Sequence, residues 1–229
     1  MSLRTLVLFD VDGTLVTGGP ARHAFHTAML ETFGTAGPID SHDFSGKTDP
    51  QIARELLEAA GFDAARIDRG LPALWAAYLT ELERRLAAQP MRALPGAEAL
   101  LDALDALDEV ALALLTGNVA RGAELKLGSA GLGGRFRVGA FGSDREERDA
   151  LPEVALERAR EHWDADFDPA RVFVVGDTPL DVRCGRVHGL RTVAVATGNH
   201  TKDALAGAGA DVTFDDLSDT EAVLEVLAE

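Results

Sequence analysis

The chain contains short runs of apolar residues that are separated by stretches with a helical spacing. Nearly every side chain from residue 3 to residue 9 is apolar, which is typical of a strand that is covered on both faces. Runs of the same kind occupy residues 110–115, 171–175 and 191–195. We therefore predict a buried strand at each of these positions.

Segments with apolar residues at every third or fourth position lie between these runs. Leu100, Leu104 and Leu107 have this spacing after Pro95, which predicts a helix over residues 95–107. The alternation of strands and helices predicts an α/β fold, namely a three-layer, doubly wound parallel sheet with helices on both faces. Right-handed crossovers place the carboxyl ends of its strands at one edge, where binding sites form. Further helices are expected over residues 151–162 and 179–188.

Residues 17–90 interrupt this alternation, because their apolar spacing is helical throughout and no convincing strand lies among the helices. We therefore predict a helical insert over residues 17–90, which follows the first strand, and an α/β core formed by residues 1–16 and 91–229. Helices of the insert are expected over residues 20–33, 50–60 and 71–88.

Two acidic residues follow the first predicted strand directly. Asp10 and Asp12 are two positions apart, so their side chains point the same way in an extended chain. Two carboxylates this close repel each other unless a cation or a shared proton stabilises the pair. Gly13 would let the chain turn sharply and bring backbone N–H groups near an anion. A solvated Asp-Gly turn is the alternative interpretation.

Polar residues also end two of the other predicted strands. Thr116 and Gly117 follow the second strand, where a hydroxyl and an N–H group at a helix start suit phosphate oxygens. Asp177 follows the third strand, and Asp181 comes four positions later. Helix N-capping is the alternative role of Thr116 and of Asp177.

Together these segments resemble the signatures of the haloacid dehalogenase superfamily, most of whose members are phosphatases. The resemblance is carried by residues 10–15 (DVDGTL), 114–118 (LLTGN) and 174–181 (VVGDTPLD), which have the order and spacing of that superfamily. It covers the whole core and implies a Rossmann-like fold.

The resemblance also implies a two-step phosphoryl transfer that uses Mg²⁺. Asp10 would attack phosphorus and form an aspartyl phosphate, while Asp12 would protonate the leaving oxygen and then deprotonate water. Thr116 and Gly117 would hold the phosphoryl group. Mg²⁺ would bind Asp10, Asp177 and the backbone carbonyl of Asp12, and Asp181 would support that site.

The third signature departs from the superfamily's pattern, which usually has a lysine before a helix, often in Lys-Pro-x-Pro. Aligning Pro152 with the later proline puts this position at or beside Asp149, so Arg148 is the nearest cation. Arginine can replace lysine as a phosphate clamp because it is always charged and can bind two oxygens. We therefore predict that Arg148 binds phosphate. Arg145 is the competing candidate, and a surface arginine is the alternative without a function.

The position of the helical insert resembles a cap of the C1 type, which closes over the core in this superfamily. Residues 45–50 (SGKTDP) are its most site-like stretch. Gly46 would allow a close approach, and Lys47 would bind a second anionic group of the substrate or serve as a solvated cation before a capped helix. Asn118 is another candidate for a substrate contact.

The charge and the cysteine content of the chain limit the kinds of partner and the compartment that we expect. The net charge is −16, and lysine and arginine residues do not cluster, which argues against a nucleic-acid partner. No apolar run approaches the ~20 residues of a membrane helix. Cys184 is the single cysteine, which excludes an internal disulfide and favours the reducing cytoplasm. We expect a cytoplasmic monomer or homodimer that acts on a small phosphorylated metabolite.

The leading hypothesis is a small-molecule phosphatase similar to phosphoglycolate phosphatases. A phosphomutase similar to β-phosphoglucomutase is an alternative on the same fold. So is a phosphonatase with a Schiff base at Lys47, although the acid at Asp12 argues against it. Outside enzymes, the alternative is a non-catalytic binding or regulatory protein, although none of the signature acids is lost.

Overall fold

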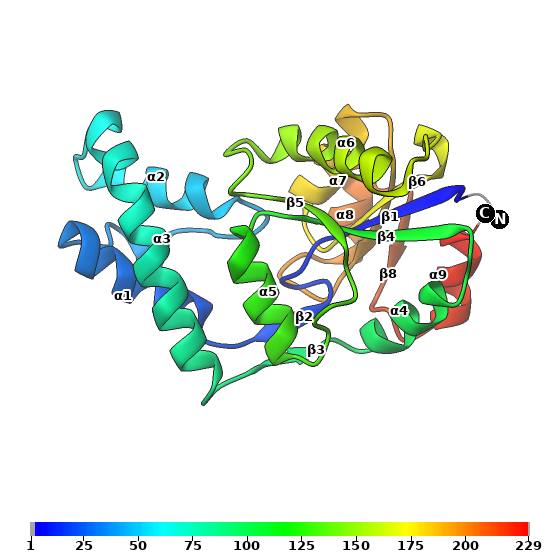
Figure 1. The fold of residues 1–229 in the computed structure, drawn as a ribbon, viewed down its shortest axis with the longest axis horizontal. Coiled ribbons are helices and arrows are strands. Elements are labelled where there is room, and N and C mark those ends of the chain that lie inside the picture. Colours follow the sequence, from blue (N-terminus) through cyan, green and yellow to red (C-terminus); the bar gives the residue numbers. More distant parts are fainter. Residues whose placement is uncertain (1–2, 229) are drawn as a thin grey trace.

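The computed structural model describes residues 3–228 and contains a six-stranded sheet whose strand pairings are all parallel. The sheet order is β5-β4-β1-β6-β7-β8, so β1 lies between β4 and β6 (Figure 1). The predicted doubly wound α/β fold is therefore confirmed. The strands are β1 (Thr5–Phe9), β4 (Val110–Thr116), β5 (Val138–Phe141), β6 (Val172–Gly176), β7 (Arg191–Val195) and β8 (Val212–Phe214).

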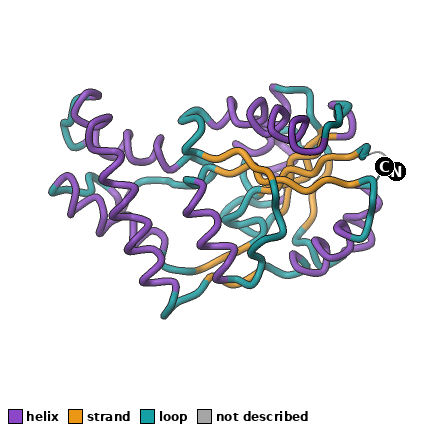
Figure 2. The backbone as a smooth tube through the Cα atoms, viewed as in Figure 1, coloured by secondary structure: helices purple, strands orange, loops and turns teal. Residues whose placement is uncertain are grey.

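Alternate residues of β1 pack into two different cores. Val7 and Phe9 pack on the side of Leu101, whereas Leu6 and Leu8 pack with Leu151. Neither face of the strand meets water, which explains its unbroken apolar run. Figure 2 shows the strands as a layer between helices. These helices are α4 (Ala97–Asp105), α5 (Ala120–Ser129) and α9 (Thr220–Leu227) on one face, α6 (Leu151–Trp163) and α7 (Pro179–Val187) on the other, and α8 (Lys202–Gly207) beside β7 and β8.

Three helices lie beyond the carboxyl ends of the central strands (Figure 1). Helix α1 packs on α3 around the ring of Phe25, which meets Tyr78 edge-to-face at a centroid distance of 5.4 Å. An antiparallel ribbon of β2 and β3 stands at the two ends of this helical segment. The division into a core and a helical insert stays a prediction. The bounds are β2 (Val16–Gly18), α1 (Ala21–Phe33), α2 (Asp49–Ala59), α3 (Ala64–Leu86) and β3 (Met91–Ala93).

Helix α3 begins at Ala64, earlier than the predicted start at residue 71. Asp63 caps it by accepting a hydrogen bond from the Arg66 N–H group at 2.8 Å. Pro72 lies inside the helix and removes one donor, but its side chain is exposed and the helix continues past it. None of the helices within residues 3–228 is long and apolar enough to cross a membrane.

The register brings the carboxyl ends of the three central strands together. Phe9 of β1 pairs with Leu114 of β4 and with Val175 of β6. The chain departs from β1 toward β4 and β5 on one side and returns to β6 on the other. Binding crevices of α/β sheets form where the strand order reverses in this way.

Candidate active site

Asp10 follows β1 at the centre of this edge. Its N–H group donates to the Val175 carbonyl at 2.9 Å, which extends the pairing with β6. Its side chain is buried, and Oδ1 accepts a hydrogen bond from Arg148 Nη2 at 3.1 Å. Burial raises the pKa of the Asp10 carboxyl, while the Arg148 charge opposes this shift. One carboxyl oxygen is thus held by a cation, and the other is left for chemistry.

Three carboxylates meet at this position. Oxygens of Asp10, Asp177 and Asp181 all lie within 4.8 Å of one another, and the three residues are buried. Burial raises the pKa of Asp177, and the charges of Asp181 and Asp10 raise it further. Arg148 brings one positive charge to the three carboxylates. A buried set of oxygen ligands with an excess of negative charge fits a small divalent cation such as Mg²⁺.

Gly13 keeps the backbone close to these acids. Its φ angle is +82°, and a Cβ atom there would lie 2.3 Å from Asp177 Oδ2. The hydroxyl of Thr14 donates to Asp177 Oδ1 at 3.5 Å. The segment after Asp12 therefore packs against the acid of another strand, which a solvated turn would not do.

The interpretation of Asp177 as a helix cap is not supported, because Thr178 is the N-cap of α7. The Thr178 side chain accepts from the Asp181 N–H group at 3.3 Å, and Asp181 Oδ2 accepts from the Thr178 N–H group at 3.0 Å. Asp181 Oδ1 binds Arg148. Asp181 therefore fixes the helix start and the arginine together, which leaves Asp177 directed at the acidic cluster.

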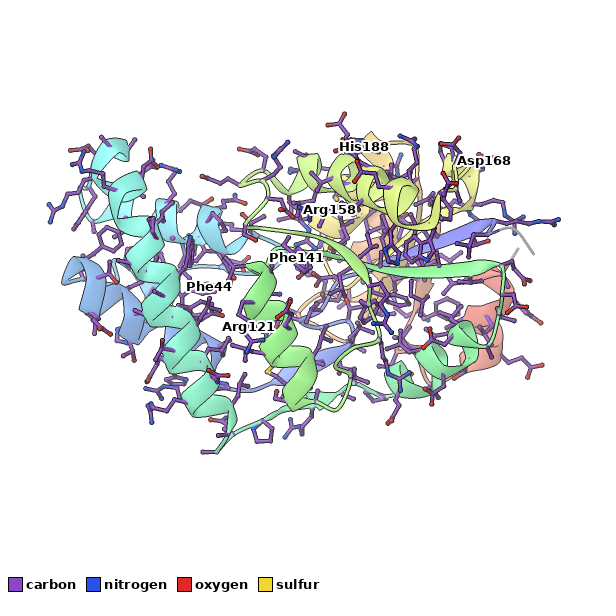
Figure 3. All side chains as sticks on the ribbon, viewed as in Figure 1. Phe44, Arg121, Phe141, Arg158, Asp168 and His188 are labelled. Carbon is purple, nitrogen blue, oxygen red and sulfur yellow. The ribbon has the colours of Figure 1, made fainter. Side chains whose placement is uncertain are left out.

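The structure brings Arg148 to the cluster and leaves Arg145 outside it. The Arg148 side chain is 3 % exposed and lies in the short helix η2 (Arg148–Ala150). Arg145 is exposed and donates to the adjacent Asp144 carbonyl at 2.9 Å. Asp144 is itself held by two hydrogen bonds of 2.7 Å from Arg158, which is labelled on α6 near Phe141 in Figure 3. This anchor fixes the loop that carries Arg148.

Thr116 ends β4 and is buried. Its Oγ1 accepts from Asn118 Nδ2 at 2.8 Å, so its own proton is available to another acceptor. Thr116 is not the cap of α5, because that helix begins at Ala120 and its N-cap position is Val119. The structure therefore places Thr116 and Asn118 together at the strand end.

Lys126 of α5 reaches the same group of residues, and the sequence analysis did not identify it. Its side chain is 6 % exposed, and Nζ donates to Asp12 Oδ2 at 2.7 Å and to Asn118 Oδ1 at 2.5 Å. Lys126 shares the buried face of α5 with Gly122 and Ala123. A lysine at helical spacing from small residues was the available signal, but no bounds were predicted for the helix expected after Thr116.

A cavity of about 430 Å³ opens between the strand ends and the helical segment. The core lines it with Asp10, Asp12 and Thr116, and the helical segment contributes Lys47. Lys47 Nζ lies 2.5 Å from Glu55 Oε2. The lysine thus lines the cavity, but it has a carboxylate partner within the helical segment.

The loop before α2 is held against the core. Gly46 has a φ angle of +68°, and a Cβ atom there would lie 2.4 Å from Thr178 Oγ1. The Asp49 N–H group donates to the Gly117 carbonyl at 2.7 Å, and Asp49 Oδ2 accepts from the Val119 N–H group at 2.8 Å. Burial raises the pKa of Asp49 to about 6. The predicted residues Gly46 and Gly117 are thus contact points between the two parts.

Comparison with protein families explains this arrangement. A family model described as haloacid dehalogenase-like hydrolase matches residues 5–189. The chain belongs to the haloacid dehalogenase-like hydrolases. The resemblance of the signatures to this superfamily is therefore confirmed.

Two curated relatives of this hydrolase are phosphatases. A phosphoglycolate phosphatase of Synechococcus elongatus is 30% identical over 227 residues, which cover 97% of this chain and 99% of that protein. An N-acetylmuramic acid 6-phosphate phosphatase of Pseudomonas putida is 30% identical over 222 residues, which cover 94% and 93%. These relatives support the predicted phosphoric monoester hydrolase.

A solved structure shares the fold of this haloacid dehalogenase-like chain. The crystal structure of a hydrolase from Pseudomonas syringae matches with a TM-score of 0.74 and 21% identity, covering 99% of this chain and 100% of that one. The doubly wound core is thus shared although most residues differ.

Proposed function

We propose that the protein is a Mg²⁺-dependent phosphatase that hydrolyses a small-molecule phosphate monoester through an aspartyl phosphate at Asp10. The observation that carries this proposal is the buried Asp10 carboxylate, which has Arg148 on Oδ1 and faces the cavity beside Asp177. Carboxylate nucleophiles that form a covalent intermediate need this kind of fixed and partly neutralised setting.

The phosphoryl group would be held by donors at the end of β4. Thr116 can donate its hydroxyl proton because its oxygen already accepts from Asn118. The Gly117 N–H group and the Arg148 guanidinium would bind further oxygens, and both residues line the cavity. Asp10, Asp177 and the backbone carbonyl of Asp12 would hold Mg²⁺, supported by Asp181, and the ion would neutralise charge on the phosphoryl oxygens.

Asp12 would supply the acid–base chemistry. Its carboxyl lines the cavity near Asp10 and would protonate the leaving oxygen while the bond from Asp10 to phosphorus forms. The same carboxylate would then take a proton from the water that hydrolyses the aspartyl phosphate. An acid at this position suits a substrate that leaves through oxygen.

The substrate class, the cellular location and the assembly of the protein are inferred from its relatives and its composition. The phosphatases similar to this chain support a small phosphorylated metabolite, so phosphoglycolate and N-acetylmuramic acid 6-phosphate are the first compounds to test. The single cysteine and the acidic charge support a cytoplasmic protein without a nucleic-acid partner. A monomer or a homodimer remains the expected assembly.

Phosphate release from these two compounds and from p-nitrophenyl phosphate tests the proposal. We expect release with Mg²⁺, and loss of release in EDTA and in Asp10→Asn. Borohydride reduction of the acid-quenched enzyme should convert Asp10 to homoserine, detectable by peptide mass spectrometry. Full activity of Asp10→Asn, or a phosphoryl group on another residue, would contradict the proposal.

A further inference from the structure

Lys126 is a buried ammonium that the two-step reaction described above does not use. Its side chain is 6 % exposed, and its partners are one carboxylate and one amide oxygen. Burial acts to lower the pKa of Lys126, but the negative charge of Asp12 outweighs it and raises this pKa. The lysine is therefore charged at neutral pH, at the cost of its desolvation.

The hydrogen bonds around Asp12 converge on one oxygen. Lys126 Nζ lies 2.7 Å from Asp12 Oδ2, and Asn118 Nδ2 lies 2.8 Å from the same atom. Asn118 also donates to Thr116 Oγ1 and accepts from Lys126, so the orientation of its amide is fixed by three partners. An oxygen that accepts two such bonds does not also carry a proton readily, so a proton on this carboxyl belongs on Oδ1.

We propose that Lys126 is a positioning residue for Asp12: it holds Oδ2 so that Oδ1 faces the cavity and exchanges the proton with the leaving oxygen. This inference rests on the proposed function, in which Asp12 is the acid and base. The Asp12 side chain is 43 % exposed and lines the cavity, so it needs an external restraint to keep one orientation. The buried Lys126 and Asn118 provide that restraint from one side.

The chemical step is then defined atom by atom. The bond from an Asp10 oxygen to phosphorus forms as the bond from phosphorus to the ester oxygen breaks, and the proton on Asp12 Oδ1 moves to that oxygen. Water later attacks the aspartyl phosphate and gives a proton to Oδ1, which releases inorganic phosphate and restores both carboxyl groups. Lys126 keeps its proton throughout.

The leaving group separates this role from a structural one. 2,4-Dinitrophenolate leaves without protonation, whereas an alkoxide does not. With an alkyl phosphate as substrate, Lys126→Met should slow the single-turnover phosphorylation of Asp10 at least ~100-fold, which is the scale of general acid catalysis. With 2,4-dinitrophenyl phosphate, the same variant should be slowed only a few-fold. Asp12→Asn should show the same selectivity, and the double variant should be no slower than Asp12→Asn. Lys202→Met, at a half-exposed lysine of α8 paired with Asp215, is the matched control.

Each result has a defined meaning. Equal slowing of Lys126→Met with both esters overturns the inference, because a residue that shapes the phosphate site or the fold affects both alike. If Asp12→Asn instead slows both esters equally, the proposed role of Asp12 as the acid, and with it the proposed function, is overturned. Should thermal unfolding show that Lys126→Met does not fold, Lys126→Gln removes the charge but retains hydrogen bonding, and the same comparison of esters decides. A much larger slowing with the alkyl ester than with 2,4-dinitrophenyl phosphate, in either folded variant, supports the inference.

Discussion

Asp10 and Asp12 are the same residue type two positions apart, yet their surroundings differ. The Asp10 side chain is buried beside Arg148, whereas Asp12 is partly exposed and binds Lys126. Each proposed catalytic acid therefore has its own buried cation. Separate environments of this kind allow two carboxyl groups to take different roles in one reaction.

The acidic cluster should make stability depend on pH in the absence of metal. The pKa of Asp177 is raised in the folded protein, so folding favours its protonated form. This contribution is fully present below about pH 4 and is lost as the pH rises through the raised pKa. We expect the free energy of unfolding in EDTA to fall toward pH 8, and Mg²⁺ to restore it.

Asp177→Asn tests this expectation by removing one charge of the cluster. The variant should be more stable than the wild type in EDTA at pH 8, by about 2 kcal/mol, and should gain little from Mg²⁺. Urea unfolding at several pH values measures both effects. Asp108→Asn, at an exposed acid, should leave the profile unchanged. If the free energy of unfolding in EDTA had the same pH dependence in the wild type and in Asp177→Asn, the prediction would be contradicted.

Arg148 should contribute to folding as well as to activity. Arg148→Met would leave Asp10 and Asp181 without their shared cation, and removal of one partner of a buried ion pair costs roughly 3–5 kcal/mol. Urea unfolding in EDTA should show this loss, and Mg²⁺ should reduce it. Arg145→Met should change stability by less than about 0.5 kcal/mol, because that side chain is exposed. Equal effects of the two substitutions would disprove the assignment.

At the residue scale, the sequence predicted those candidate site residues that directly follow a strand. Asp10, Thr116 and Asp177 could be placed together because parallel strands end at one edge. Arg148 was identified by its distance from Pro152. Lys126 could not be found in this way, because its place depends on how α5 packs on the sheet.

At the scale of elements, burial decided what could be predicted. The inner strands β1, β4, β6 and β7 are rich in apolar residues and almost wholly buried, and they form where the sequence predicts strands. The edge strands β5 (VGAF) and β8 (VTF) have only four and three residues, which is too short to stand out as a run. Helix α5 contains Gly122 and Gly128, which weaken its helical signal, and it is stabilised by packing on the core.

The turn between β1 and β2 should be sensitive to its glycine for two separable reasons. Gly13→Ala and Gly61→Ala both place a side chain at positive φ, at +82° and +86°, which costs about 1 kcal/mol or more. Only Gly13→Ala would also push on Asp177, since the space around Gly61 is open within the described residues. We expect kcat/KM to fall by about 100-fold in Gly13→Ala alone, because displaced active-site groups cost this much.

Activity assays and thermal unfolding of both glycine variants distinguish the two effects. Similar losses of stability with a loss of activity confined to Gly13→Ala would fit the structure. Full activity of Gly13→Ala would show that Asp177 does not need its present position.

At the scale of the whole molecule, the helical segment and the core meet through few polar contacts beside the cavity. Thr48 Oγ1 donates to the Glu146 carbonyl at 2.6 Å, and Arg54 Nε donates to the Glu146 carboxylate at 2.7 Å. The predicted order of elements did not reveal these contacts. They depend on the relative position of the two parts, which neither apolar spacing nor the signatures specify.

Arg54→Met should loosen this junction with little effect on global stability. The ion pair is partly exposed, so its loss should cost less than about 1 kcal/mol. Amide hydrogen exchange of residues 45–49 and 146–149 should become faster in the variant, because local opening needs less free energy. Arg84→Met, at an exposed pair within α3, is the matched control. Unchanged exchange in Arg54→Met would show that other contacts hold the junction.

The position of β1 in the sheet has a consequence for biosynthesis. This strand is made before both of the strands that it pairs with, β4 and β6, which begin at residues 110 and 172. At about 5–20 residues per second, the ribosome needs roughly 5–20 s to reach β4 after completing β1. During that time this strand, which is buried in the folded protein, lacks both of its neighbours, so the segment that carries Asp10 is exposed to aggregation while the nascent chain grows.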